Sequence, residues 1–189
     1  MPRSGYAPMP NHRAPAPVQR QNADLEEAAG ILKAGLTKLT GFFGQPQRPG
    51  KDQIAAFLDK EIAPYFDFSY MAQWAAGPMY RRMGEQQQKA METDIKTRFL
   101  TTMAQKLTSF NNQSVSYLPP RQSSAKQVEL SITIGNRGSY PARLDFRLYK
   151  SANGWKVYDV SANGSSALMY YRQYYRQQMR QAPMPRFPR

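Results

Sequence analysis

The sequence predicts an α+β domain in which helices come first, a four-stranded antiparallel sheet follows, and one helix ends the fold. Two observations support this prediction. Up to about residue 110, apolar residues recur at intervals of three and four, which is the period of a helix. From there to residue 160 they alternate with polar residues, which is the period of a strand with one wet and one dry face.

Composition limits the chemistry that this chain can perform. Its 189 residues suffice for one domain with a substantial core and two tails. It has no cysteine, which excludes disulfides and thiolate chemistry, and its one histidine, His12, leaves a conventional zinc site without a ligand set. The formal net charge is +13, and eight of the excess charges lie in residues 1–22 or after Asp159. Such basic ends can attract the phosphates of lipids or nucleic acid.

The first half of the chain predicts two helices after a disordered tail. Residues 1–22 are basic and rich in Pro, Asn and Gln, with little that could pack. The first helix is expected to begin near Asp24 and to end at Gly41, and one apolar stripe marks it: Leu25, Ala28, Leu32, Leu36 and Leu39. A second helix is expected between Asp52, which can cap it, and Pro64, which stops it.

A short helix and a long helix are predicted next. Asp67 or Ser69 can cap the short helix, and Gly77 breaks it. The long helix, from Glu85 to Phe110, is expected to lie across the sheet. It carries apolar residues at intervals of four, and Glu92–Lys96 and Asp94–Arg98 are expected to pair on its wet face.

Four strands and a last helix complete the prediction. The first two strands are expected at Gln113–Leu118 and Gln127–Ile134, and the last two form a hairpin around Asn153-Gly154, which supplies the conformation of a tight turn. The last helix is expected from about Ser166 to Arg180, and residues 181–189 are expected to be a disordered tail.

Two separated stretches resemble the MlaC/toluene-tolerance family. Residues 66–107, which begin FDFSYMAQWAAGPMYRR, resemble its central helices, and residues 143–179 resemble its C-terminal part. The closest matches are Trp155-x-x-Tyr158-Asp159-Val160 and the following Asn163-Gly164-x-Ser166. With the order of helices included, the resemblance covers roughly residues 24–180.

The resemblance implies an NTF2-like fold, in which a curved four-stranded antiparallel sheet is covered by helices around an apolar lipid cavity. Residues 23–180 would form this MlaC-like domain. The implied function is that of a soluble periplasmic carrier, not an enzyme, which shuttles phospholipid between the outer and inner membranes. The implied partners are an inner-membrane ABC transporter with its MCE-domain ring and an outer-membrane lipoprotein complex. The chain lacks a signal peptide and would be the mature form.

The expected lipid contacts come from both layers of such a cavity. Sheet residues would form its floor, helix residues its roof, and the last helix one rim. The candidates are Val128, Leu130, Ile132, Leu144, Phe146 and Leu148 for the floor, Phe68, Met71, Trp74, Phe99 and Met103 for the roof, and Leu168 and Tyr171 for the rim. For each of them, ordinary core packing is an equally good interpretation. No catalytic residue, metal or cofactor is expected, and phospholipid is the cargo.

Three alternatives remain open. A related carrier could bind hopanoid or another lipid. NTF2-like folds also host isomerases and dehydratases, but Asp159 fits a structural hydrogen-bond acceptor better than an acid catalyst, and Asp145 alternates onto the wet face. The run YYRQYYRQQMR could stack on bases and neutralise phosphates, but tyrosines at helical spacing are more typical of packing, so nucleic acid is not favoured as a partner. Transient contact of the basic ends with a membrane surface is compatible with all these interpretations.

Overall fold

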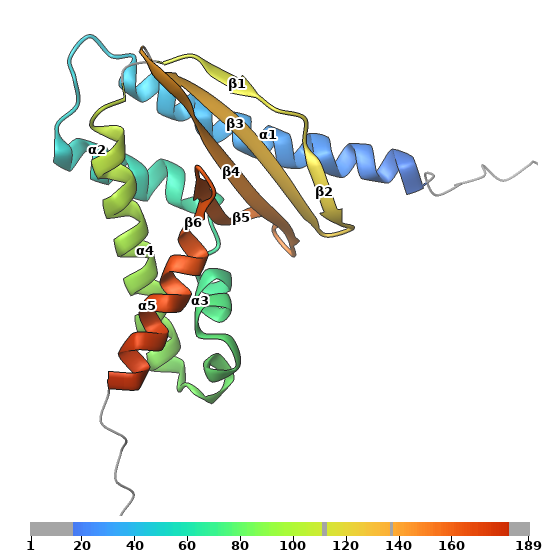
Figure 1. The fold of residues 1–189 in the computed structure, drawn as a ribbon, viewed down its shortest axis with the longest axis vertical. Coiled ribbons are helices and arrows are strands. Elements are labelled where there is room, and N and C mark those ends of the chain that lie inside the picture. Colours follow the sequence, from blue (N-terminus) through green and yellow to red (C-terminus); the bar gives the residue numbers. More distant parts are fainter. Residues whose placement is uncertain (1–16, 111–112, 137, 182–189) are drawn as a thin grey trace, which may run out of the picture.

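A computed structural model describes residues 17–110, 113–136 and 138–181 (Figure 1). Within them, helices precede an antiparallel sheet and one helix follows it, so the predicted α+β class is confirmed. Most of the predicted disorder falls on residues 1–16 and 182–189, which lie outside the described residues. None of the helices described is long and apolar enough to cross a membrane.

The first helix, α1, spans Pro17–Phe43 and therefore begins earlier than the sequence predicts. Pro17 is tolerated there because the first turn of a helix does not use its N–H groups. Asp24 therefore lies inside α1, where it pairs with Lys150, whose Nζ lies 2.7 Å from a carboxylate oxygen. The predicted stripe is confirmed, since Ala28 and Leu32 on it are buried.

Irregular turns connect the next two helices. Helix α2 (Lys51–Phe57) continues as a π-helical turn, η1 (Leu58–Ile62), and a 3-10 turn, η2 (Ala63–Tyr65). Helix α3 (Phe68–Ala76) is capped by Asp67, whose side chain accepts a 2.9 Å hydrogen bond from the N–H of Tyr70. Gly77 ends α3 with φ at +61°, a conformation that favours glycine. The 3-10 turn η3 (Gly77–Arg82) follows.

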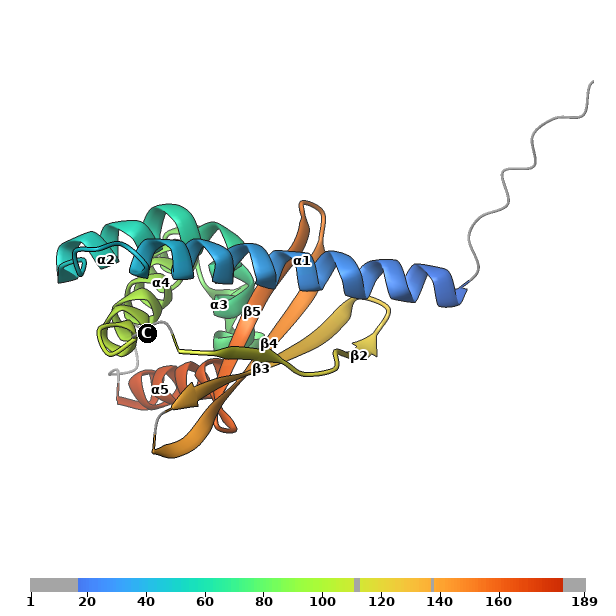
Figure 2. The same ribbon diagram turned by 90° about the horizontal axis from the view of Figure 1, so that it is seen from above.

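The long helix α4 (Glu85–Leu107) packs mainly against α3, α2 and η1 and does not lie across the sheet, so this prediction is wrong. Its buried stripe, which includes Ile95 and Phe99, packs against α3 instead. The helix that runs along a face of the sheet is α1 (Figure 2). On the wet face of α4, the expected pair Asp94–Arg98 forms at 3.0 Å, but Lys96 pairs with Asp59 of η1 rather than with Glu92.

The sheet has six strands rather than four. They are β1 (Val115–Tyr117), β2 (Arg121–Ser124), β3 (Gln127–Asn136), β4 (Ser139–Ser151), β5 (Gly154–Ala162) and β6 (Ser165–Ser166). Their order is β1-β3-β4-β5-β6, and β2 also pairs with β3. The two strands that the sequence did not reveal, β2 and β6, are short and polar, so no alternation of apolar residues marks them.

The register places the predicted floor residues on one face. Every pair is antiparallel, and opposite residues share a face of the sheet. The relevant pairs are Val128 with Leu148, Leu130 with Phe146, and Ile132 with Leu144.

A β-bulge lies between β4 and β5. Arg147 pairs with Asp159 and Leu148 pairs with Val157, which leaves Tyr158 as the extra residue. The bulge explains why β5 presents apolar side chains to both sides.

Candidate functional site

The predicted floor forms one apolar cluster that α1 covers. Val128, Leu130, Ile132 and Leu148 are buried there, together with Ala28 and Leu32 of α1 and Trp155 and Val157 of β5. The other two floor residues, Leu144 and Phe146, are only half-buried at the edge of this sheet cluster. The floor therefore faces α1 and not the predicted roof.

The predicted roof and rim form a second cluster, between α3, α4 and α5 (Ala167–Gln181). Phe68, Met71, Phe99, Leu168 and Tyr171 are buried in this helical cluster, and Met103 packs against it. Trp74 differs from the rest, because 42% of its surface is exposed.

A third cluster brings together residues whose contact the sequence does not predict. It contains Ile54, Leu58 and Ile62, and the ends of α1 and α4 pack against it. Phe42 and Phe57 stack there with ring centroids 4.0 Å apart. Their positions could have been suspected from the apolar ends of α1 and α2, but their spatial proximity depends on the path of the loop between them.

The three clusters meet at Phe66. This side chain packs against all of them. Its ring lies 4.8 Å from that of Phe99 and 5.8 Å from that of Phe68, and its backbone forms an isolated parallel bridge with Val157. Phe66 is nevertheless only half-buried. A residue at the junction of the whole core thus remains accessible.

Other half-buried apolar residues extend this junction. Leu100 and Met103 of α4 each pack against the helical and the third cluster, and Val160 of β5 packs against the sheet and the helical cluster. Phe146 is the partner of Val160 across the strands. We call these five residues the apolar seam: Phe66, Leu100, Met103, Phe146 and Val160.

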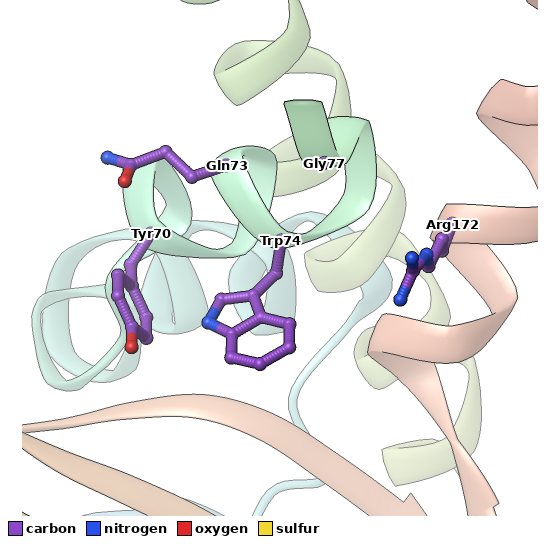
Figure 3. A pocket seen from close by; sticks show the side chains of 5 residues that line it. All are labelled: Tyr70, Gln73, Trp74, Gly77 and Arg172. Carbon is purple, nitrogen blue, oxygen red and sulfur yellow. The ribbon is translucent and has the colours of Figure 1, made fainter. Parts of the chain in front are cut away.

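Two hollows of the described chain lie away from the predicted floor, and Trp74 is the one expected lipid contact that lines either of them. A hollow of about 250 Å³ lies between α3 and α5 and is lined by Tyr70, Gln73, Trp74, Gly77 and Arg172 (Figure 3). A hollow of about 590 Å³ lies along α4 and is lined by polar residues from Gln86 to Thr97 and by Ala90. The seam residues pack against the three clusters of buried side chains.

The aspartates of the strands hold the fold together. Asp159 is 1% exposed and accepts hydrogen bonds from Arg147 at 2.6 Å, from Ser166 at 2.7 Å and from the N–H of Leu168 at 3.0 Å. It therefore anchors the first turn of α5. Asp145 accepts a 2.5 Å bond from Ser131 and a 2.8 Å bond from Arg143. Both carboxylates are committed to structural donors, as expected for Asp159.

Asp67 connects α3 to the sheet in the same way. Its second oxygen accepts a hydrogen bond from the hydroxyl of Tyr149, whose ring stacks on Tyr70 at 3.9 Å. Burial and the bond to Asp67 both raise the pKa of Tyr149 above its ordinary value. Across the described residues, no three metal-ligating side chains gather at one place.

Comparison with known proteins gives a consistent result. The family model described as "MlaC protein" matches residues 43–186, a range that begins at the last residue of α1. Among solved structures, the fold is similar to that of a phospholipid-binding protein from Ralstonia solanacearum in complex with a phospholipid. The two chains are 29% identical, with a TM-score of 0.71, and the match covers 80% of this chain and 86% of the other. No curated protein sequence gives a significant match.

Proposed function

The chain belongs to the MlaC protein family, and from that premise we propose that it is a carrier of phospholipid. The acyl chains of the cargo lie along the apolar seam, between the sheet and the helices. The similar protein from Ralstonia solanacearum, which was solved with a phospholipid, supports the class of cargo. The seam supports its location.

The observation that carries the proposal is the half-burial of Phe66. A core residue of this size is normally removed from water, because burial of each CH₂ group is worth about 0.8 kcal/mol. Phe66 touches all three clusters and yet keeps accessible surface. An acyl chain in contact with Phe66 and Phe146 would cover this surface. Long chains offer many CH₂ groups, so binding needs no polar contact to the tails.

The seam opens when cargo enters. A carrier also exists without cargo. Because contact between water and an empty apolar cavity is unfavourable, the three clusters pack against one another when no lipid is bound. Three separate clusters can part along their common border without breaking the sheet. The irregular turns η1 and η2 lie between α2 and α3, beside this border, and π-helical turns are frequent at functional sites.

The lipid contacts predicted from the sequence divide accordingly. The half-buried seam residues Met103 and Phe146, with neighbouring Leu144, meet the acyl chains first. Phe68 and Phe99 lie next to Phe66 and are exposed to the cargo once the seam opens. The fully buried floor residues under α1 and the buried rim residues of α5 contact lipid only if those helices move.

The carrier operates in the periplasm, between the outer and inner membranes, in an NTF2-like arrangement of sheet and helices. It receives lipid from, or delivers it to, an outer-membrane lipoprotein complex and an inner-membrane ABC transporter with its MCE-domain ring. Membership of the MlaC family supports this role, which involves no catalysis.

Organic extraction of the purified protein followed by mass spectrometry tests the proposal. We expect phospholipid to co-purify with the protein, and the delipidated protein to take up phospholipid again from vesicles. Protein that neither retains phospholipid nor takes it up, while its circular dichroism is that of a folded domain, would contradict the proposal. A hopanoid in the extract would show that the cargo belongs to another lipid class.

A further inference from the structure

More than half of the exposed large apolar side chains of the described chain belong to three neighbouring elements. Eight large hydrophobic residues are exposed in the described chain, and five of them belong to α3, η3 or α5: Trp74, Met79, Met169, Tyr170 and Met179. Apolar side chains that are exposed next to one another commonly mark an interaction surface. The seam does not use any of these residues, so they need a separate explanation.

Helix α5 combines this apolar surface with positive charge. Its buried side, with Leu168 and Tyr171, packs into the helical cluster. Met169, Arg172, Arg176 and Arg180 recur at intervals of three and four and therefore share a neighbouring flank. Neither η3 nor α5 contains an acidic residue, and η3 adds Arg81 and Arg82.

The hollow between α3 and α5 joins the arginine flank to Trp74. Trp74 and Arg172 lie on facing sides of this hollow, with Tyr70 and Gln73 beside the tryptophan (Figure 3). The indole is 42% exposed, and Met169 on the adjoining turn of α5 is 50% exposed. We call Trp74, Met169, Arg172, Arg176 and Arg180 the arginine face.

We infer that the arginine face docks the protein on the anionic surface of a lipid membrane. Guanidinium groups pair with lipid phosphates, and an indole with one apolar and one polar edge is suited to the level of the head groups. The side chains of Trp74 and Met169 enter the interface between the arginines. The inference rests on the proposed function in one respect only, which is that a carrier of phospholipid must reach a membrane to exchange its cargo.

A membrane fits this face better than an acidic protein or a nucleic acid. A protein partner would have to match each projecting side chain with its own pocket, whereas a fluid interface adapts to Trp74 and Met169 wherever they stand. A single-stranded nucleic acid would need a row of stacked aromatic platforms, and the arginine face offers one exposed indole. The apolar residues therefore favour lipid over the other anionic partners.

Co-sedimentation of the full-length protein with vesicles tests this inference. Vesicles of phosphatidylcholine alone are compared with vesicles in which a third of the lipid is phosphatidylglycerol. We expect binding to the anionic vesicles that weakens with added salt. Each arginine near such a surface is worth roughly a fivefold change in affinity, so the triple variant R172Q/R176Q/R180Q should bind on the order of a hundredfold more weakly.

A matched control removes the same charge elsewhere. The variant K51Q/K106Q/K126Q changes three exposed residues outside α3, η3 and α5, and should bind more strongly than the arginine variant. Trp74 supplies an independent signal, because Trp155, the other tryptophan, is already buried. Anionic vesicles should shift the emission of the native protein to shorter wavelength, and W74F should abolish the shift.

Three results would overturn the inference. They are equal vesicle binding by the two triple variants, no binding by the native protein, and binding to polyglutamate or an oligonucleotide in place of vesicles. The amount of co-purified lipid separates this test from that of the proposed function. The arginine variant should keep its co-purified phospholipid but lose its binding to vesicles. Failure of the proposed carrier function would instead appear as loss of lipid from the native protein.

Discussion

Replacement of Asp159 by asparagine should strongly destabilise the fold. The carboxylate is 1% exposed and accepts bonds from Arg147, Ser166 and the N–H of Leu168. Asp159→Asn keeps the shape but removes the charge, and one of its oxygens becomes an amide group that cannot accept from Arg147. Removal of one partner from a buried ion pair costs about 3–5 kcal/mol of unfolding free energy. Because the amide oxygen of the asparagine still accepts and Arg147 is 37% exposed, we expect a loss near the lower end of this range, about 3 kcal/mol.

Urea denaturation, monitored by circular dichroism, measures this loss of unfolding free energy. A domain of this size loses about 2–4 °C of Tm for each kcal/mol, so the thermal midpoint should fall by about 10 °C. The control is Asp59→Asn, which removes a carboxylate that is 64% exposed and pairs with Lys96 at 3.1 Å. Exposed pairs contribute at most about 1 kcal/mol, so the control should stay close to the native protein.

A loss below 1 kcal/mol for Asp159→Asn, or equal losses for the two variants, would refute the view that Asp159 anchors α5 to the sheet. Activity assays have no place in this test, because the role that the geometry gives to Asp159 is structural.

Three further predictions concern the seam, pH and one turn. Phe146→Asp should lower the phospholipid content of the purified protein at least tenfold, since the cargo would desolvate a carboxylate in the seam. The control Tyr140→Asp, at a position on the same strand that is 94% exposed, should leave the phospholipid content unchanged. Equal phospholipid content in the two variants would contradict the proposed position of the acyl chains along the seam. Burial raises the pKa of Tyr171 to about 12, and burial with a bond to Asp94 raises that of Tyr175. Because the folded protein then keeps protons that the unfolded chain releases, the urea midpoint should fall as the pH rises above about 10, and Tyr175→Phe should flatten that fall. Gly77→Ala should cost about 1 kcal/mol because φ is +61° there, while Gly30→Ala within α1 should stabilise by about 0.5–1 kcal/mol; thermal melts that rank the two in the opposite order would refute this.

The strongly periodic parts of the fold could be predicted from the sequence. Alternation along β3 and β4 indicated which side chains share a face, and the register confirms it. Asn153-Gly154 indicated the hairpin, and the structure has Gly154 there at φ +96°. These features depend on neighbours in sequence, where period and turn chemistry decide the conformation.

The arrangement of helices could not be predicted in the same way. Both α1 and α4 carry an apolar stripe of sufficient length, and the sequence does not say which of them covers the sheet. The choice depends on long-range packing, in which α3 occupies the stripe of α4 and leaves the sheet to α1. The predicted floor and roof consequently separate into two clusters.

For the same reason, the sequence points to only some residues of the proposed seam. Met103 and Phe146 of the proposed lipid contacts lie on the seam, but its central residue, Phe66, was not singled out. Its role follows from the meeting of three clusters, which no local pattern records. Trp74 was expected inside the cavity because it lies on an apolar helix, and the structure instead exposes it beside Arg172.

Photo-crosslinking with a phospholipid that carries a diazirine in its acyl chain tests the central claim most directly. The delipidated protein is loaded with this lipid, irradiated and digested, and the modified residues are identified by mass spectrometry. We predict crosslinks at Phe66, between Leu100 and Met103, and at Phe146. Crosslinks confined to the hollow at Trp74 and Arg172 or to the outer face of α4, with none along the seam, would contradict the account.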